Sequence, residues 1–169
     1  MPPTTPASRI TQLWARLSPL PCGTWLFSRA LGFMVPYTDS IGAHVRELSA
    51  GHARVTMADR RQVRNHLRSV HAIALANLGE VATGLAMITA APQDVRSILV
   101  ALSVTYLTKA RGRLQAECRC EMVLVTETLE QDVAADITNP AGEVVARVVA
   151  RWRLSPPQIR TAHSQNGAR

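Results

Sequence analysis

The chain has 169 residues and a net charge of +7 at pH 7, with 47% hydrophobic and only 4% aromatic residues. This length suits one domain with a hydrophobic core, and the composition excludes an extensively disordered chain. With so few aromatic rings, the core must be built from Ala, Val, Leu and Ile. The positive charge fits a solvated basic surface, and only a local cluster of arginines would favour a polyanionic partner.

The three cysteines, Cys22, Cys118 and Cys120, lack the spacing of a disulfide or zinc framework. Two positions apart on a strand, Cys118 and Cys120 would share a face and pack as small apolar side chains. No further Cys or His lies near them, so we expect no metal site. An odd cysteine count, and a start without a charged and then apolar leader, favour the cytoplasm.

The ends of the chain differ in composition from its middle. We expect flexible tails at residues 1–8, which are rich in Pro and Thr, and at residues 155–169, where two prolines precede a polar run. Residues 9–154 contain no internal repeat or long linker, so we predict a single domain there.

Residues 9–40 are predicted to be the helical part of this domain. Ile10–Leu17 and Thr24–Met34 have the pattern of two short amphipathic helices, and prolines and a glycine interrupt the run between them. We expect this pair to cover the main core as a lid. A membrane-surface helix is the alternative interpretation.

From residue 43 the apolar residues recur at every second position, which indicates strands. Ala43 and Val45 belong to a first strand, and Ala53, Val55 and Met57 belong to a second. The short turn sequence between these two strands predicts a hairpin.

Residues 71–90 are apolar almost all round, which is typical of a helix buried in a core or in a membrane. The segment is about long enough to cross a bilayer, but Glu80 lies near its centre, where a carboxylate costs about 2.5–3.5 kcal/mol. Strand patterns on both sides favour a helix enclosed by a sheet.

Four strand patterns follow this helix. Residues 97–107 are too apolar for a half-exposed strand, so we expect them at the centre of the sheet. Residues 113–122 and 143–153 alternate apolar and polar side chains, residues 132–138 form a further strand, and an Asn-Pro-Ala-Gly turn precedes the last one. One long helix against one antiparallel sheet predicts an α+β layer architecture.

The stretch from Asn65 to His71, with Glu80 nine residues later, resembles the hotdog-fold thioesterases of the phenylacetate-pathway (PaaI) type. That family combines an Asn, a short loop, a His-Gly-Gly, an apolar helix and an acidic residue. The resemblance covers Ile41–Arg153, and the N-terminal part resembles a largely uncharacterised thioesterase-like branch. It implies a hotdog fold, in which a curved antiparallel sheet wraps a long central helix, here with extra N-terminal helices.

The resemblance implies an acyl-CoA thioesterase, and the residues carry matching chemistry. Glu80 is the candidate base or nucleophile, because burial raises the pKa of a carboxyl. The Ala72 N–H, at the helix start, is the candidate oxyanion donor. Asn65 would orient the carbonyl or the water, and His71 would position the loop. Each has an ordinary alternative: an ion-paired or solvated Glu80, a turn residue at Asn65, and a helix-start or core histidine at His71.

Two departures from the family pattern bear on activity. Ala72-Ile73 stands where the family has Gly-Gly, so the Ala72 Cβ narrows the approach of a thioester to the backbone N–H. The segment Ile98–Leu102 is apolar where some members carry a Ser, Thr or Asp. The alternative function is therefore a non-catalytic hotdog protein that binds acyl thioesters.

Helix geometry indicates that one chain cannot complete the site. Nine residues rotate a helix by about 180°, so His71 and Glu80 of one chain point opposite ways. The resembling family places its sites between two protomers, and we predict an obligate homodimer or a dimer of dimers.

The carrier to which the acyl group is linked as a thioester would be coenzyme A or an acyl carrier protein, and we expect no other cofactor. Basic residues beside the loop and after the apolar strand are the candidates for binding the phosphates of coenzyme A, with a solubilising rim as the alternative. These residues are Arg64, Arg68, Lys109 and Arg111.

Other functions fit the sequence less well. A hotdog hydratase would carry an acid several residues before a His, and a nucleic-acid module would interleave aromatic and basic residues. Neither pattern occurs in this sequence. We therefore expect no nucleic-acid partner and no membrane span.

Overall fold

The structure is a computed structural model that describes residues 6–121 and 124–156. Its helices and strands follow the predicted order, with one additional short helix before the first hairpin. The helices are α1 (Pro6–Leu17), α2 (Gly23–Met34), α3 (Pro36–Ser40) and α4 (Ala72–Ala90), with a single 3-10 turn at Arg61–Val63. The strands are β1 (His44–Ser49), β2 (His52–Met57), β3 (Arg96–Tyr106), β4 (Leu114–Arg119), β5 (Leu129–Thr138) and β6 (Val144–Ser155).

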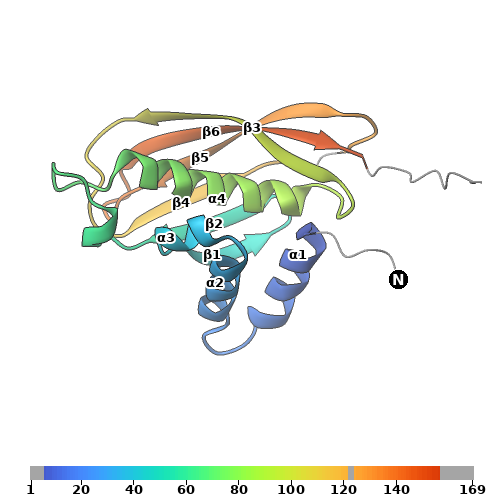
Figure 1. The fold of residues 1–169 in the computed structure, drawn as a ribbon, viewed down its shortest axis with the longest axis horizontal. Helices are drawn as coiled ribbons and strands as arrows, with labels where there is room; N and C mark the ends of the chain where they lie inside the picture. The colour runs from blue at the N-terminus through green and yellow to red at the C-terminus, as the bar shows by residue number, and fades with distance from the viewer. Residues whose placement is uncertain (1–5, 122–123, 157–169) are drawn as a thin grey trace, which may run out of the picture.

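The six strands form one sheet in the order β1-β2-β4-β5-β6-β3, and every pair of neighbours is antiparallel. Helix α4 lies along the inner side of this curved sheet and contacts all six strands (Figure 1). This enclosure explains why α4 is apolar almost all round. It is long and apolar enough to cross a membrane by length and composition, but most of it is buried against the sheet.

Small residues on α4 let the helix approach the sheet closely. A Cβ atom at Gly79 would overlap the side chain of Val148 on β6. The buried positions of β4 and β6 alternate as predicted, and the core they build is almost entirely aliphatic. Leu114, Ala116 and Cys118 supply the inner face of β4.

The N-terminal helices form a hairpin that packs beside β1 and against α4 (Figure 1). The rings of Trp14 and Phe27 meet edge to face, with centroids 4.9 Å apart, and hold α1 against α2. Helix α1 begins at Pro6 and Ser8 is buried, so residues 6–8 belong to the helix rather than to the expected tail. Residues 1–5, 122–123 and 157–169 lie outside the described residues.

The prediction that residues 97–107 form a central strand is wrong for the single chain. Among the residues that the structure describes, strand β3 is the last strand of the sheet and pairs only with β6. Three of its large apolar side chains are about two-fifths exposed: Ile98 at 42%, Val100 at 38% and Leu102 at 38%. Apolar composition indicates that a strand is to be buried, but it does not say whether the same chain or another one covers it.

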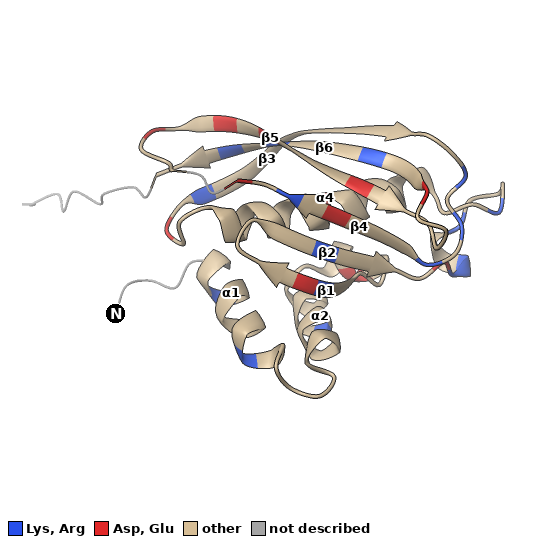
Figure 2. Cartoon of the chain, turned by 180° about the vertical axis from the view of Figure 1, so that it is seen from behind, with Lys and Arg blue, Asp and Glu red and all other residues tan. Residues whose placement is uncertain are grey.

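Acids of β5 stand opposite arginines of β6 in the strand register, and Figure 2 marks the charged positions along the strands of the sheet. Asp132 and Arg151 form a two-point ion pair at 2.6 and 2.9 Å, and Glu130 pairs with Arg153 at 2.7 Å. Exposed pairs of this kind contribute about 0–1 kcal/mol each. They neutralise the arginines of β6, which therefore give no support for a polyanionic partner.

Candidate active site

Asn65 closes the loop that precedes α4. Its side-chain Oδ1 accepts hydrogen bonds from the Leu67 N–H at 2.9 Å and from the Ser69 N–H at 3.2 Å. The Asn65 N–H donates to the Ser69 carbonyl at 2.8 Å, and Arg68 adopts a φ of +56° within the turn. The side-chain oxygen is thus engaged in the loop, so Asn65 can meet a ligand only as a donor, through its amide NH₂.

Asn65 and Ala72 lie together on the wall of a cavity of about 340 Å³, between this loop, the start of α4 and the end of β3. Ala72 is the first residue of α4, so its N–H has no acceptor within the helix and can donate to an oxyanion. The Tyr106 hydroxyl donates to the Ala72 carbonyl at 3.1 Å and ties the end of β3 to this turn. We name this space the loop cavity.

His71 caps helix α4. Its ring Nδ1 accepts a hydrogen bond from the Ile73 N–H at 3.1 Å, and its backbone N–H donates to the Val63 carbonyl at 2.7 Å. The exposed ring lines a different hollow, beside Tyr37 and Ile41. This geometry gives His71 the role of a helix cap that fixes the start of α4.

Glu80 lies in the middle of α4 and lines a second cavity, of about 110 Å³, between α4, the N-terminal helices and β6. We name this space the helix cavity. Its other walls include Leu31, Val35, Ile88 and Trp152. Burial raises the pKa of the half-buried Glu80 carboxyl. Within residues 6–121 and 124–156 this carboxyl has no ion-pair or hydrogen-bond partner, so the alternative of a buried pair with an arginine does not apply.

The structure therefore brings Asn65 and Ala72 together and places Glu80 elsewhere on the same helix. The loop cavity and the helix cavity lie at different points along α4 and are lined by different residues. This separation agrees with the rotation expected between the helix start and Glu80. A thioester bound in the loop cavity would need its base from another source than the same chain's Glu80.

Two uncovered apolar features lie close to these residues. The least buried positions of α4 recur at helical spacing, at Ile73, Ala76, Glu80 and Ile88, and form one stripe of the helix. The open edge of β3 carries unpaired backbone groups and exposed apolar side chains. A long, apolar and unpaired edge strand is a template for pairing with another chain.

Four basic residues are the predicted contacts for the phosphates of coenzyme A. Lys109 lines the loop cavity itself, and the Arg111 Nε donates to the Arg68 carbonyl at 3.2 Å. Arg64 is more restricted, because its Nε donates to Asp59 at 2.6 Å, which also raises its pKa. Arg68, Lys109 and Arg111 are thus better placed than Arg64 to meet a phosphate.

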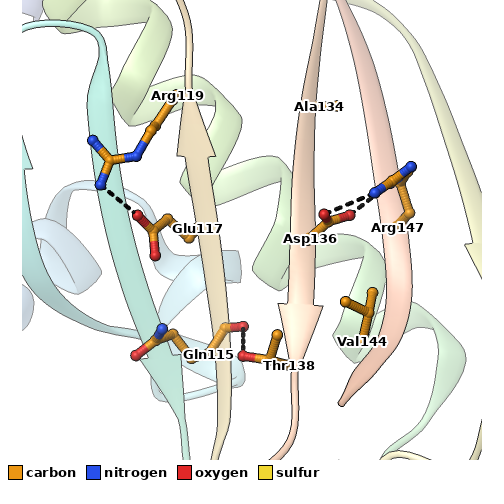
Figure 3. Close-up of a pocket in the computed structure, with 8 residues that line it drawn as sticks. All are labelled: Gln115, Glu117, Arg119, Ala134, Asp136, Thr138, Val144 and Arg147. Carbon is orange, nitrogen blue, oxygen red and sulfur yellow. Dashed lines mark hydrogen bonds and ion pairs between the residues drawn. The ribbon is translucent and has the colours of Figure 1, made fainter. Parts of the chain in front are cut away.

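A larger hollow, of about 450 Å³, lies on the outer face of the sheet, away from α4 (Figure 3). Asp136 and Arg147 cross it as a two-point ion pair at 2.6 and 2.8 Å, and Arg119 pairs with Glu117 at 2.8 Å. Its charges therefore satisfy one another and leave no unpaired group for catalysis. In the described part of the chain no group of three or more His, Cys, Asp or Glu could hold a metal ion.

Sequence reasoning missed three residues that shape the two cavities. Tyr106 bonds to the start of α4, and nothing in the apolar strand pattern indicates this contact. Asp59 accepts from Arg64 and, at 2.9 Å, from the Gly112 N–H, and these bonds help to lower its pKa. Trp152 belongs to the alternating pattern of residues 143–153, but its place beside Glu80 depends on how β6 crosses α4.

Comparisons with known proteins identify the family and the fold. A family described as a domain of unknown function, DUF4442, matches residues 23–154. The structural-genomics protein APC5556 is 30% identical over 89% of this chain and 98% of its own, with a TM-score of 0.75. No curated protein matches this chain.

Two further solved structures are similar to this chain. A Pseudomonas aeruginosa protein described as a probable thioesterase is 22% identical, with a TM-score of 0.71 over 81% of this chain and 97% of its own. A mutant of the phenylacetic acid degradation protein PaaI from Thermus thermophilus is 20% identical, with a TM-score of 0.60 over 70% of this chain and 97% of its own. These similarities confirm the hotdog fold.

Proposed function

This chain belongs to the DUF4442 family, and from that premise we propose that it is an acyl-CoA thioesterase that hydrolyses an acyl thioester to a free acid and coenzyme A. The observation that carries the proposal is Glu80: an unpaired carboxyl with a raised pKa, on the uncovered stripe of the central helix of a hotdog fold. A desolvated carboxylate without a partner is a better base than a solvated one. The free cysteines suit a reducing cytoplasm.

In the proposed reaction, the Glu80 carboxylate takes a proton from a water molecule as that water attacks the thioester carbonyl carbon. The carbonyl oxygen becomes an oxyanion, which the Ala72 N–H stabilises together with the positive end of the helix dipole. The tetrahedral intermediate then expels the thiolate of coenzyme A, which receives the proton held by Glu80. Asn65 donates from its amide NH₂ to the carbonyl or to the water.

We propose that each site is shared between two copies of the chain. The loop cavity of one protomer would receive Glu80 of its partner, because the two features of one protomer line different cavities. Pairing of β3 with its counterpart would satisfy the open sheet edge and cover Ile98, Val100 and Leu102. A homodimer, alone or within a dimer of dimers, would thus contain two identical sites.

Coenzyme A carries several phosphates, and the mouth of the loop cavity carries unpaired positive charge. We assign phosphate binding to Lys109, Arg68 and Arg111, with Arg64 as a more distant contributor held by Asp59. Guanidinium groups bind phosphate oxygens at two points, which positions the thioester end of the ligand toward Ala72.

A mixing experiment tests the shared site. Glu80→Gln and Asn65→Ala should each lose activity alone, but subunits exchanged between the two variants should recover about one quarter of wild-type activity, because half of the dimers would contain one intact site. Two Glu80→Gln samples mixed in the same way provide the control. No recovery from subunits that demonstrably exchange would contradict a site built from two chains.

A non-catalytic acyl-thioester-binding protein is the second candidate function. It is favoured by Ala72, whose Cβ lies on the wall of the loop cavity where the resembling thioesterases have glycine. The apolar β3, without a polar side chain at Ile98–Leu102, favours it too. Saturable binding of acyl-CoA without release of free thiol would establish this function.

A further inference from the structure

The helix cavity has the composition of a site for a hydrocarbon chain. Aliphatic side chains from three N-terminal positions, Ile10, Leu31 and Val35, face the α4 residue Ile88 across it. Glu80 supplies the only ionisable group among the residues that line it. An apolar wall of this kind favours methylene groups over polar substituents, by about fourfold in affinity for each methylene that is fully buried.

Gly84 lets the indole ring of Trp152 pack directly against α4, beside Glu80. A Cβ atom at this position would lie 3.2 Å from the outer edge of the Trp152 ring and 3.8 Å from the Glu80 Oε1. The distance to the ring is tighter than an ordinary van der Waals contact, so a larger residue would have to displace Trp152. The glycine therefore keeps this part of the cavity wall free of a side chain.

The wall of the same cavity contains a second unpaired polar group. The Trp152 indole N–H is buried and has no hydrogen-bond acceptor among the residues that the structure describes, although Trp152 itself is only 7% exposed. Buried indole N–H groups usually find a partner. Apart from Glu80 and Thr38, the described residues that line the cavity are apolar, which suits a ligand with one polar end and a hydrocarbon chain.

We propose that the helix cavity binds the acyl chain of the substrate, and that the N-terminal helices and Trp152 restrict it to a short, unbranched aliphatic chain. This inference rests on the proposed function. The volume of about 110 Å³ is smaller than the roughly 150 Å³ of an engineered cavity that holds benzene. A cavity of this size favours the first few methylene groups of a chain beside Glu80 over a phenyl ring.

The test is a chain-length profile. Free-thiol release is measured with acetyl-, butyryl-, hexanoyl-, octanoyl-, lauroyl- and phenylacetyl-CoA for the wild type, Gly84→Val, Ile10→Ala and the control Leu20→Ala, which changes an exposed residue between α1 and α2. In the wild type, kcat/KM should rise with chain length up to butyryl or hexanoyl and then fall, with phenylacetyl-CoA hydrolysed poorly. Gly84→Val should lower the hexanoyl-to-acetyl ratio at least tenfold, because its methyl groups fill the cavity. Ile10→Ala should raise the octanoyl-to-butyryl ratio, and the control should match the wild type.

The outcomes separate this inference from the proposed function. Hydrolysis with a flat chain-length profile, or with a profile that both variants leave unchanged, would overturn the acyl site and leave the thioesterase standing. If no acyl-CoA is hydrolysed, the proposed thioesterase function is wrong. The affinities of the same acyl-CoAs for the same proteins, measured by calorimetry, then test the acyl site, because the ratios of affinity between chain lengths should change in the variants as predicted for kcat/KM. Should Gly84→Val fold poorly by circular dichroism, Ile10→Ala alone decides, because its site on α1 is only half-buried.

Discussion

Substituting Leu102 by arginine should break the proposed dimer. Leu102 lies on the open strand β3 and is 38% exposed in the single chain. Burying an aliphatic side chain completely contributes about 1.5–3 kcal/mol, so covering the exposed two-fifths of Leu102 contributes about 0.6–1.2 kcal/mol per copy. Leu102→Arg in both copies removes about twice that amount and adds two like charges to the interface.

Together these effects amount to about 2–3 kcal/mol, which raises the dimer dissociation constant about 30- to 150-fold. Sedimentation equilibrium over a range of protein concentrations measures this change directly. Leu20→Arg is the matched control, because it places the same charge at an exposed leucine in the turn between α1 and α2, away from β3 (Figure 1). Circular dichroism verifies that both variants keep the fold.

Two results would refute this reasoning. A wild-type protein that is monomeric at micromolar concentration would remove the dimer altogether. A Leu102→Arg variant that dimerises as tightly as the wild type would show that β3 is not at the interface. If the account is correct, Leu102→Arg also loses thioesterase activity as it dissociates, whereas Leu20→Arg retains it.

Three further predictions concern α4 and the loop cavity. Burial raises the pKa of the Glu80 carboxyl, so its ionisation opposes folding, and the stability of the wild type falls as pH rises from the ordinary pKa of 4.5 through the raised one. Glu80→Gln should therefore melt at a higher temperature than the wild type at neutral pH, and the two melting temperatures should converge in acid. A difference in melting temperature that stays constant with pH would disprove the shift. Tyr106→Phe loses the hydrogen bond to the Ala72 carbonyl, so it should lower the free energy of unfolding in urea by about 0.5–1.5 kcal/mol and weaken acyl-CoA binding. An unchanged free energy of unfolding and an unchanged affinity would show that this bond does not support the site. The added side chain of Gly79→Val would collide with Val148, so this variant should lower the free energy of unfolding in the same assay by about 1–3 kcal/mol or more. Ala76→Val, on the open stripe of α4, should lower it by less. Equal losses would contradict the close packing of α4 on β6.

The main elements of this fold are readable from sequence because each has a strong local pattern. Residues 72–90 are apolar almost all round, which is typical of a helix buried in a core or in a membrane, and β4 and β6 alternate with period two because one face is buried. The place of β3 in the sheet has no such local sign. Its side chains are those of a buried strand, and the sequence does not state whether the same chain or a second one buries them.

The elements that carry the candidate residues were predictable from sequence, but their geometry was not. The spacing of Asn65, His71 and Glu80 predicts a loop, a helix start and a carboxyl within the helix, and the three residues lie on those elements. The spacing could not indicate that the side-chain oxygen of Asn65 accepts hydrogen bonds from its own loop. These bonds depend on a turn in which Arg68 adopts a positive φ. The cavity beside Glu80 depends on long-range packing of α1, α2 and β6, for which no local pattern exists.

The measurement that tests the central claim most directly is free-thiol release from a panel of acyl-CoAs by the wild type and Glu80→Ala in parallel. The account predicts turnover by the wild type that falls at least a hundredfold in Glu80→Ala, the usual loss when a general base is removed, while the variant stays folded. Turnover that survives the substitution would contradict the assignment of Glu80. A folded wild type that binds acyl-CoA and releases no thiol would contradict the thioesterase itself.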